Sequence, residues 1–232
     1  MTIRDDLLKH QIALQRLAVT EANNIKQYLK QLNEQAKAMV KAGIPNNLIK
    51  LSLRNLMSSL PETAVQNMLD IAEYENRFSI KTFNKYINKE LTPATRESLE
   101  KAITNKSIAV GARSGSHGKQ LTTAYRRFAR NKADEITQII RDSRTANIED
   151  VGALLDERFA GLQSTQALSL SVVAVNFTAA VARDAIDIPM IWVTALDQYV
   201  CEYCENNHGE LIDEVGVPPA HWGCRCHIEP LT

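Results

Sequence analysis

The sequence predicts a mainly α-helical protein with many helices in its N-terminal and middle regions and a small β-containing module at its C-terminal end. Two observations support this fold class. Apolar residues recur at helical spacing along most of the chain, and only 9 Gly and 7 Pro interrupt the 232 residues. All four cysteines lie in the last 32 residues, beside a β-rich run. We therefore expect a helical body over 1–160, and over 161–232 a helix followed by the cysteine-rich module.

The first 40 residues are expected to form one long helix. Thr2 is a suitable capping residue, and Gly43 and Pro45 end the pattern. Apolar residues spaced alternately four and three apart form a narrow seam: Ile25, Leu29, Leu32, Ala36 and Met39. Such a seam favours a helix packed in a bundle, with a docking helix for a partner as the alternative.

Further helices are expected between capping residues, prolines and glycines, over 47–60, 61–86, 92–105, 121–143, 148–160 and 164–184. Asn147 is expected to cap the fifth of these and Gly161 to end it. The last is apolar on two faces, which is typical of a helix buried between neighbours. Pro189 ends the helical region, and the β-rich run 190–195 predicts a short strand.

The net charge is zero but unevenly distributed. Residues 1–150 hold 24 basic and 16 acidic side chains, whereas residues 151–232 hold 3 and 11. Such asymmetry indicates contact with a polyanion or a docking surface. No apolar run approaches 18 residues, so we expect no membrane span. The first residues lack the apolar region of a signal peptide, so a reducing compartment is expected, which favours metal binding over disulfides.

The basic charge is densest over residues 101–144, which hold ten basic and three acidic side chains. This region predicts a surface for nucleic acid or an acidic partner, with these candidate residues: Arg113, Lys119, Arg126, Arg127, Arg130 and Lys132. No groove-reading motif accompanies them, so a nucleic-acid contact would be independent of sequence and sensitive to salt. The other interpretation is an ordinary surface helix. The glycine-rich run 111–119 is not a phosphate loop, because Gln120 stands where Ser or Thr is required.

The C-terminal segment carries a metal-ligand pattern, Cys-x2-Cys-x16-His-x2-Cys-x-Cys. Its five candidate ligands are Cys201, Cys204, His221, Cys224 and Cys226. Thiolate and imidazole are the ligands that zinc prefers, and two thiolates three positions apart can hold one ion from a tight turn. The preferred set of four ligands comprises Cys201, Cys204, His221 and one of the last two cysteines. The alternative set comprises all four cysteines and leaves His221 unbound. The spacing of the residues does not distinguish the two sets.

The same pattern argues for a structural zinc ion. About 40 residues with few large apolar side chains form little core, and a metal can supply the missing stability. A catalytic site keeps one position open for water, whereas here the candidate ligands outnumber the four places. His208 and His227 also lie nearby, but loop histidines are more often solvated. We therefore expect no catalytic residue. Two disulfides or free thiols are the remaining interpretations.

The order of these residues resembles the C-terminal signature of the phage head morphogenesis family, the Mu F-like minor capsid proteins. The resemblance spans about residues 164–232 and rests on these positions: Trp192, Asp197, Cys201, Cys204, Gly209, Pro219, His221, Cys224, Arg225 and Cys226. It implies a structural minor head protein of a tailed phage, assembled in the host cytoplasm and located in the virion, at the head interior or portal vertex. It implies the portal protein or major capsid protein as partners, with packaged DNA as a further, non-specific one.

The resemblance also implies a role in head morphogenesis, and in DNA ejection for those members that leave with the genome. No small-molecule substrate is expected. Two alternatives from other classes stay open. One is a zinc-containing effector enzyme or toxin, because similar tails occur fused to effector domains. The other is a zinc module that binds DNA at preferred sites.

Overall fold

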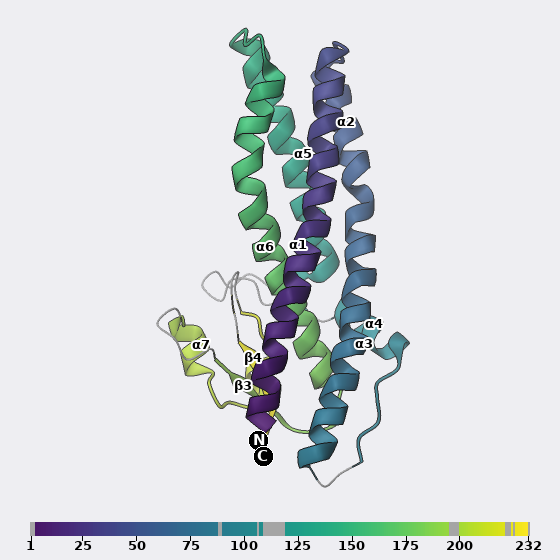
Figure 1. The fold of residues 1–232 in the computed structure, drawn as a ribbon, viewed down its shortest axis with the longest axis vertical. Helices are drawn as coiled ribbons and strands as arrows, with labels where there is room; N and C mark the ends of the chain where they lie inside the picture. The colour runs from purple at the N-terminus through teal and green to yellow at the C-terminus, as the bar shows by residue number, and fades with distance from the viewer. Residues whose placement is uncertain are drawn as a thin grey trace. The chain divides into compact units, whose positions relative to one another are not determined.

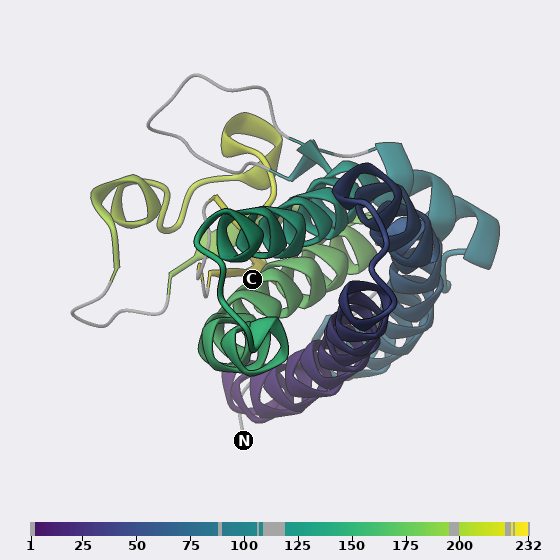
Figure 2. The ribbon, with the colours of Figure 1, turned by 90° about the horizontal axis from the view of Figure 1, so that it is seen from above.

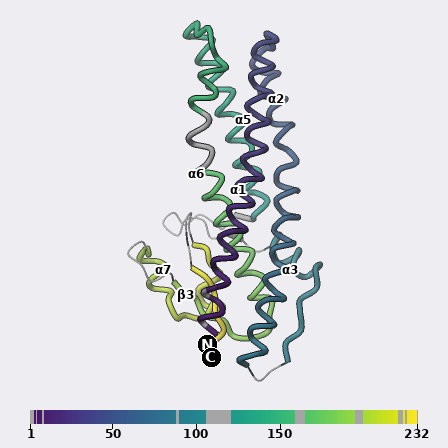
Figure 3. Tube along the Cα trace, in the orientation of Figure 1, coloured from purple at the N-terminus to yellow at the C-terminus, as the bar shows by residue number. Residues whose placement is uncertain are grey.

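The protein is mainly helical, as predicted, with a small sheet in its C-terminal region (Figures 1 and 3). The computed structural model describes residues 3–87, 90–105, 107–108, 119–194, 200–220, 224 and 226–231. Its larger helices are α1 (Ile3–Lys41), α2 (Asn46–Leu56), α3 (Leu60–Tyr86), α4 (Arg96–Asn105), α5 (Leu121–Thr145) and α6 (Val151–Asp184). Its shorter elements are η1 (Met57–Ser59), α7 (Glu202–Asn206), α8 (Ile212–Val215), β1 (Ser107–Ile108), β2 (Lys119–Gln120), β3 (Met190–Val193) and β4 (His227–Pro230).

The chain divides into two compact units, each assembled from segments that are distant in the sequence. Unit 1 comprises Met1–Val19, Val65–Leu121 and Ser169–Thr232, and unit 2 comprises Thr20–Ala64 and Thr122–Leu168. The contiguous division expected at residues 160 and 161 falls inside α6, which is one continuous helix. The C-terminal module therefore belongs to the same unit as the N-terminal end of the chain.

Unit 2 contains the seam of α1. Ile25, Leu29, Leu32 and Ala36 are fully buried there, as expected of a helix that packs in a bundle. Gly43 ends α1 with φ +69, a left-handed conformation that glycine adopts without strain, and the next helix begins at Asn46. This short connection and the one between α5 and α6 can both be followed in Figure 2.

Asn147 ends α5 instead of starting the next helix, so the prediction of its role was wrong. It adopts a left-handed φ of +52, and the backbone N–H of Ile148 bonds to the carbonyl of Ser143 at 3.0 Å. Asp150 is the cap of α6, because its carboxylate accepts from the N–H of Ala153 at 2.8 Å. The predicted helix end at Gly161 is also wrong, since α6 continues to Asp184.

The start of α4 also differs from the sequence prediction. The helix begins at Arg96, three residues after Pro93, and Thr95 caps it by accepting from the N–H of Ser98 at 3.2 Å. Thr92 and Thr95 are both suitable caps by residue type. The sequence pattern therefore located this helix correctly but placed its start too early.

The core of unit 1 joins helices to the small sheet. Its buried cluster includes these residues: Leu7, Ile80, Phe83, Leu91, Ala180, Ile186, Met190, Ile212 and Ile228. Strands β3 and β4 pair antiparallel, with Trp192 opposite Ile228. On the other edge of β3, Gly209 donates its N–H to the Trp192 carbonyl at 2.8 Å, and Trp192 donates to the Glu210 carbonyl at 2.9 Å. The predicted strand at 190–195 is thus present over Met190–Val193.

One helical segment among the described residues, Thr165–Asp184, is long and apolar enough to cross a membrane. Two thirds of its apolar window is buried inside the protein, as in the core helix of a soluble fold. It also contains Arg183, which is buried in an ion pair with Glu75 at 2.6 Å. This burial is what the two apolar faces of the sequence predicted.

Candidate metal centre

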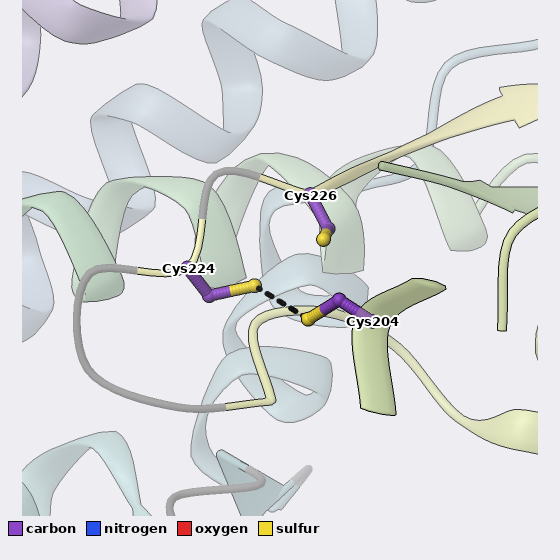
Figure 4. A group of neighbouring side chains, drawn as sticks. All are labelled: Cys204, Cys224 and Cys226. Atoms are coloured by element: carbon purple, nitrogen blue, oxygen red, sulfur yellow. Dashed lines mark hydrogen bonds between the residues drawn. The ribbon is translucent and has the colours of Figure 1, made fainter. Parts of the chain in front are cut away.

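Three cysteine sulfurs converge in unit 1. The Sγ atoms of Cys204, Cys224 and Cys226 all lie within 4.8 Å of one another, and Figure 4 shows the three side chains pointing toward a common point. The Sγ atoms of Cys204 and Cys224 are 3.8 Å apart. Two thiolates on one tetrahedral ion with metal–sulfur bonds of about 2.3 Å would be separated by about 3.8 Å. The Cys204–Cys224 pair has this spacing, and the three sulfurs together could hold one metal ion.

The three converging cysteines come from two segments. Cys204 lies in α7, whose N-terminal cap is Cys201 in an extended conformation. Cys224 and Cys226 precede β4, which begins at His227. Strand pairing of β4 with β3 brings this second segment back to the first, since Trp192 of β3 packs in the same buried cluster as all three cysteines.

Helix α6 holds the cysteine-bearing segment through two backbone carbonyls. Asn176 donates from Nδ2 to the carbonyl oxygen of Cys224 at 3.0 Å, and Arg183 donates from Nη1 to the carbonyl oxygen of Ile228 at 2.8 Å. The two contacts lie on either side of Cys226. They fix the backbone of the segment, and so they set the direction of the cysteine side chains independently of any metal.

Arg183 is itself held by a buried carboxylate. Glu75 of α3 accepts from Arg183 Nε at 2.6 Å, from His10 Nε2 at 2.5 Å and from Ser79 Oγ at 3.1 Å. The ring of His10 stacks on Phe78 with centroids 3.5 Å apart. Burial by itself would raise the pKa of Glu75, but the charge of Arg183 and the bond from His10 hold this pKa below its ordinary value. The carboxylate is therefore ionised, and it accepts hydrogen bonds from all three of these side chains.

The sulfurs also influence each other's protonation. Hydrogen bonds from the thiols of Cys204 and Cys226 lower the pKa of Cys224 below its ordinary value, and the bond to Cys224 raises the pKa of Cys204. One thiolate among three neighbouring sulfurs is the arrangement that attracts a soft cation, because metal binding requires deprotonated cysteine.

The centre is closed to solvent on the side that the structure describes. The exposed fractions of Cys204, Cys224 and Cys226 are 2%, 1% and 4%, and Trp192 and Ala220 complete the buried cluster. Tyr203 meets Trp192 edge-on, with ring centroids 6.3 Å apart. Such enclosure is typical of a metal that supports structure, since a catalytic metal requires a path for substrate and water.

The remaining candidate ligands have different positions. Cys201 is half-buried and packs against the same cluster, but its sulfur is not one of the three that converge. His221 lies outside the described residues, so the preference for it as a ligand stays a prediction. His208 accepts from the backbone N–H of Thr194 at 3.2 Å, and His227 contacts Glu229 at 3.0 Å.

The predicted basic surface is only partly on the surface. Arg126, Arg127 and Arg130 of α5 are exposed. Lys132 is buried and its ammonium contacts Glu135, so its inclusion in a surface was wrong. Arg113 lies outside the described residues, and for Lys119 the structure describes only the backbone, in β2.

The sequence analysis missed the residues that support the cysteines. Asn176, Arg183 and Glu75 lie far from the cysteine pattern in the sequence. One signal was present: Arg183 is a charged residue at the end of the most apolar helical segment, and a buried charge requires a partner. The sequence does not identify that partner as Glu75, which lies 108 positions away.

Comparisons with protein-family models, curated proteins and solved structures give no match to this chain. The functional argument therefore depends on the geometry of the cysteine cluster and on the ligand pattern of the sequence.

Proposed function

We propose that the chain is a structural protein whose C-terminal module is held together by one zinc ion, and that it serves as a minor head protein of a tailed phage. The convergence of three buried sulfurs supports the first half of this proposal. Tetrahedral sulfur coordination is typical of zinc, and the 3.8 Å between the Sγ atoms of Cys204 and Cys224 is much longer than a disulfide bond.

In this proposal Cys204, Cys224 and Cys226 are three of the four ligands. The fourth is His221 or Cys201, the two remaining candidates of the sequence pattern. Zinc bound there would fasten α7 to the segment that enters β4. Metal binding would add to the hydrogen bonds that α6 already makes to this segment, and so stabilise the sheet of unit 1.

The role in a phage head rests on the resemblance of residues 164–232 to the Mu F-like signature. The closed character of the metal centre is consistent with a structural part and with the absence of a catalytic task for these cysteines. The proposed partners are the portal protein or the major capsid protein, with packaged DNA as a further contact.

Metal analysis of the purified protein tests the zinc centre. We expect about one zinc ion per chain, and no zinc in a Cys224→Ser variant. His208→Ala is the matched control, because His208 bonds to Thr194 and should leave the zinc content unchanged. A full zinc content in Cys224→Ser would contradict the assignment of the ligands.

The role in the head needs a separate test. Co-expression with a portal protein encoded in the same genome should give a complex that survives size-exclusion chromatography, and mass spectrometry should find the chain in purified virions. A chain that is absent from virions and does not associate with portal or capsid protein would refute the head assignment while leaving the zinc centre intact.

A further inference from the structure

Unit 2 contains a pocket of about 280 Å³ that is lined by three arginines. Arg54 reaches it from α2, and Arg126 and Arg130 reach it from α5, where they lie one helical turn apart. Ser58 of η1 also lines the pocket, but its hydroxyl donates to the backbone carbonyl of Asn55 at 2.7 Å. Arg127, the neighbour of Arg126 in sequence, is exposed but does not line the pocket.

The three arginines differ in how far they are already engaged. Arg54 forms a bidentate ion pair with Asp134. Its Nε donates to Oδ1 at 3.0 Å and its Nη2 donates to Oδ2 at 2.7 Å. Lys50 also approaches Asp134, at 3.4 Å. Among the described residues no carboxylate pairs with Arg126 or Arg130, so the charges around this pocket sum to an excess of positive charge.

The rest of the lining is apolar. Met57, Pro61 and Ala129 form walls that cannot solvate an ion or compete for the guanidinium groups. Positive charge beside low-dielectric walls concentrates the electric field in the pocket and raises the local concentration of anions. Arginine is well suited to bind them, because its planar group presents several N–H donors in a fixed geometry.

We propose that this pocket binds a phosphate group. A carboxylate offers only two acceptor oxygens in one plane. A single arginine can donate to both of them, as Arg54 does to Asp134. A phosphate presents oxygens in several directions. It can therefore accept from Arg126 and Arg130 together, with Arg54, which is already paired with Asp134, at the rim. The phosphate belongs either to a nucleic-acid backbone or to a free phosphate compound.

This inference separates residues that the sequence treated as one surface. Arg126 and Arg130 form the phosphate site, whereas Arg127 takes no part in it. All three are nevertheless exposed arginines that lie close together on α5. The inference is independent of the zinc centre, which lies in unit 1. Its failure would leave the metal content of the protein unchanged.

Calorimetric titration with inorganic phosphate tests the site directly. The double variant Arg126→Ala/Arg130→Ala should weaken phosphate binding by at least about tenfold, because it removes two charge-assisted contacts. Arg127→Ala is the matched control, and it should change the affinity by less than about twofold. Far-UV circular dichroism checks that both variants keep their helices.

A mixed-sequence DNA duplex distinguishes the two sources of phosphate. If the pocket takes a backbone phosphate, the double variant weakens DNA binding and lowers the slope of log affinity against log salt by about one, whereas Arg127→Ala leaves the slope unchanged. Phosphate binding without DNA binding assigns the site to a free phosphate compound. The proposal is overturned if the wild-type protein binds a polyglutamate peptide but not phosphate, or neither, or if Arg127→Ala weakens phosphate binding as much as the double variant.

Discussion

Asn176 of α6 donates a hydrogen bond from Nδ2 to the backbone carbonyl of Cys224 at 3.0 Å. The bond is buried and connects residues 48 positions apart. Asn176 thereby fixes the peptide unit that follows one of the three converging cysteines. A core helix, and not only the metal, thus sets the geometry of the candidate site.

Replacing Asn176 by Leu should weaken zinc binding. The variant leaves the Cys224 carbonyl without a donor, so the loop is no longer held in the conformation that the ion requires. Loss of an outer contact of this kind lowers metal affinity by about tenfold or more. Competition with a chromophoric chelator measures the change.

Gln11→Ala is the control for that experiment. Gln11 donates to the other end of the Asn176 amide, to Oδ1 at 3.5 Å, a weak contact that does not touch the metal loop. The control should lose much less zinc affinity than Asn176→Leu. Equal losses in both variants would show that general packing around α6, and not the Cys224 carbonyl bond, is responsible.

Chelation should affect the C-terminal module more than the helices. Removing zinc leaves three buried thiols in place of thiolate–metal bonds, so α7 and the β3–β4 pair should become exposed to solvent. Hydrogen exchange should rise sharply at the N–H of Trp192, which bonds to the Glu210 carbonyl, and at the N–H of Glu205, which bonds to the Cys201 carbonyl at the start of α7, while far-UV circular dichroism keeps most of its helical signal. Uniform loss of helical signal on chelation would contradict this expectation.

Helix positions were predictable from the sequence because they depend on local signals. The seam of α1 and the glycine that ends it were both visible, and both are present. Two of the errors arose where two suitable capping residues lie close together, as Thr92 and Thr95 do before α4 and as Asn147 and Asp150 do before α6. Asn147 has the side chain of an N-cap, yet its position after α5 places it in the left-handed conformation that ends a helix.

The candidate site was predictable only in part. The spacing of the cysteines reveals that they act together, since metal ligands follow a short local pattern. It does not distinguish Cys201 from Cys204, because both belong to the same Cys-x2-Cys turn; the structure places only the second among the converging sulfurs. The supports Asn176 and Arg183 act through tertiary contacts, which no local pattern encodes.

Glu75→Ala should destabilise unit 1 strongly. It leaves the Arg183 guanidinium buried without its carboxylate, and breaking one partner of a buried ion pair costs about 3–5 kcal/mol. Urea denaturation measures the loss. The double variant Glu75→Leu/Arg183→Met removes both charges and should lose less than Glu75→Ala alone. A larger loss in the double variant would show that Arg183 matters mainly through its bond to Ile228.

The stability of the protein should fall in acid, in part through Glu75. The pKa of this carboxyl lies below its ordinary value of 4.5, so its ionised form is favoured in the folded state. Its contribution is therefore fully present above about pH 4.5 and is lost as the pH falls through the lower, folded-state pKa. Protonation there would remove the charge that neutralises Arg183 in the core.

Urea midpoints measured from pH 7 to pH 3 test this for the wild type and for Glu75→Gln. The variant should be less stable at pH 7 and should lose less further stability below pH 4.5, so the two curves converge in acid. Asp6, Asp134 and Asp156 also have lowered pKa values, because Lys85, Arg54 and Lys37 bond to them, but both proteins share these groups. The difference between the curves below pH 4.5 therefore reports Glu75 together with its bonded partners Arg183 and His10, and parallel curves there would mean that the Glu75 carboxyl keeps the same protonation in the folded and unfolded states.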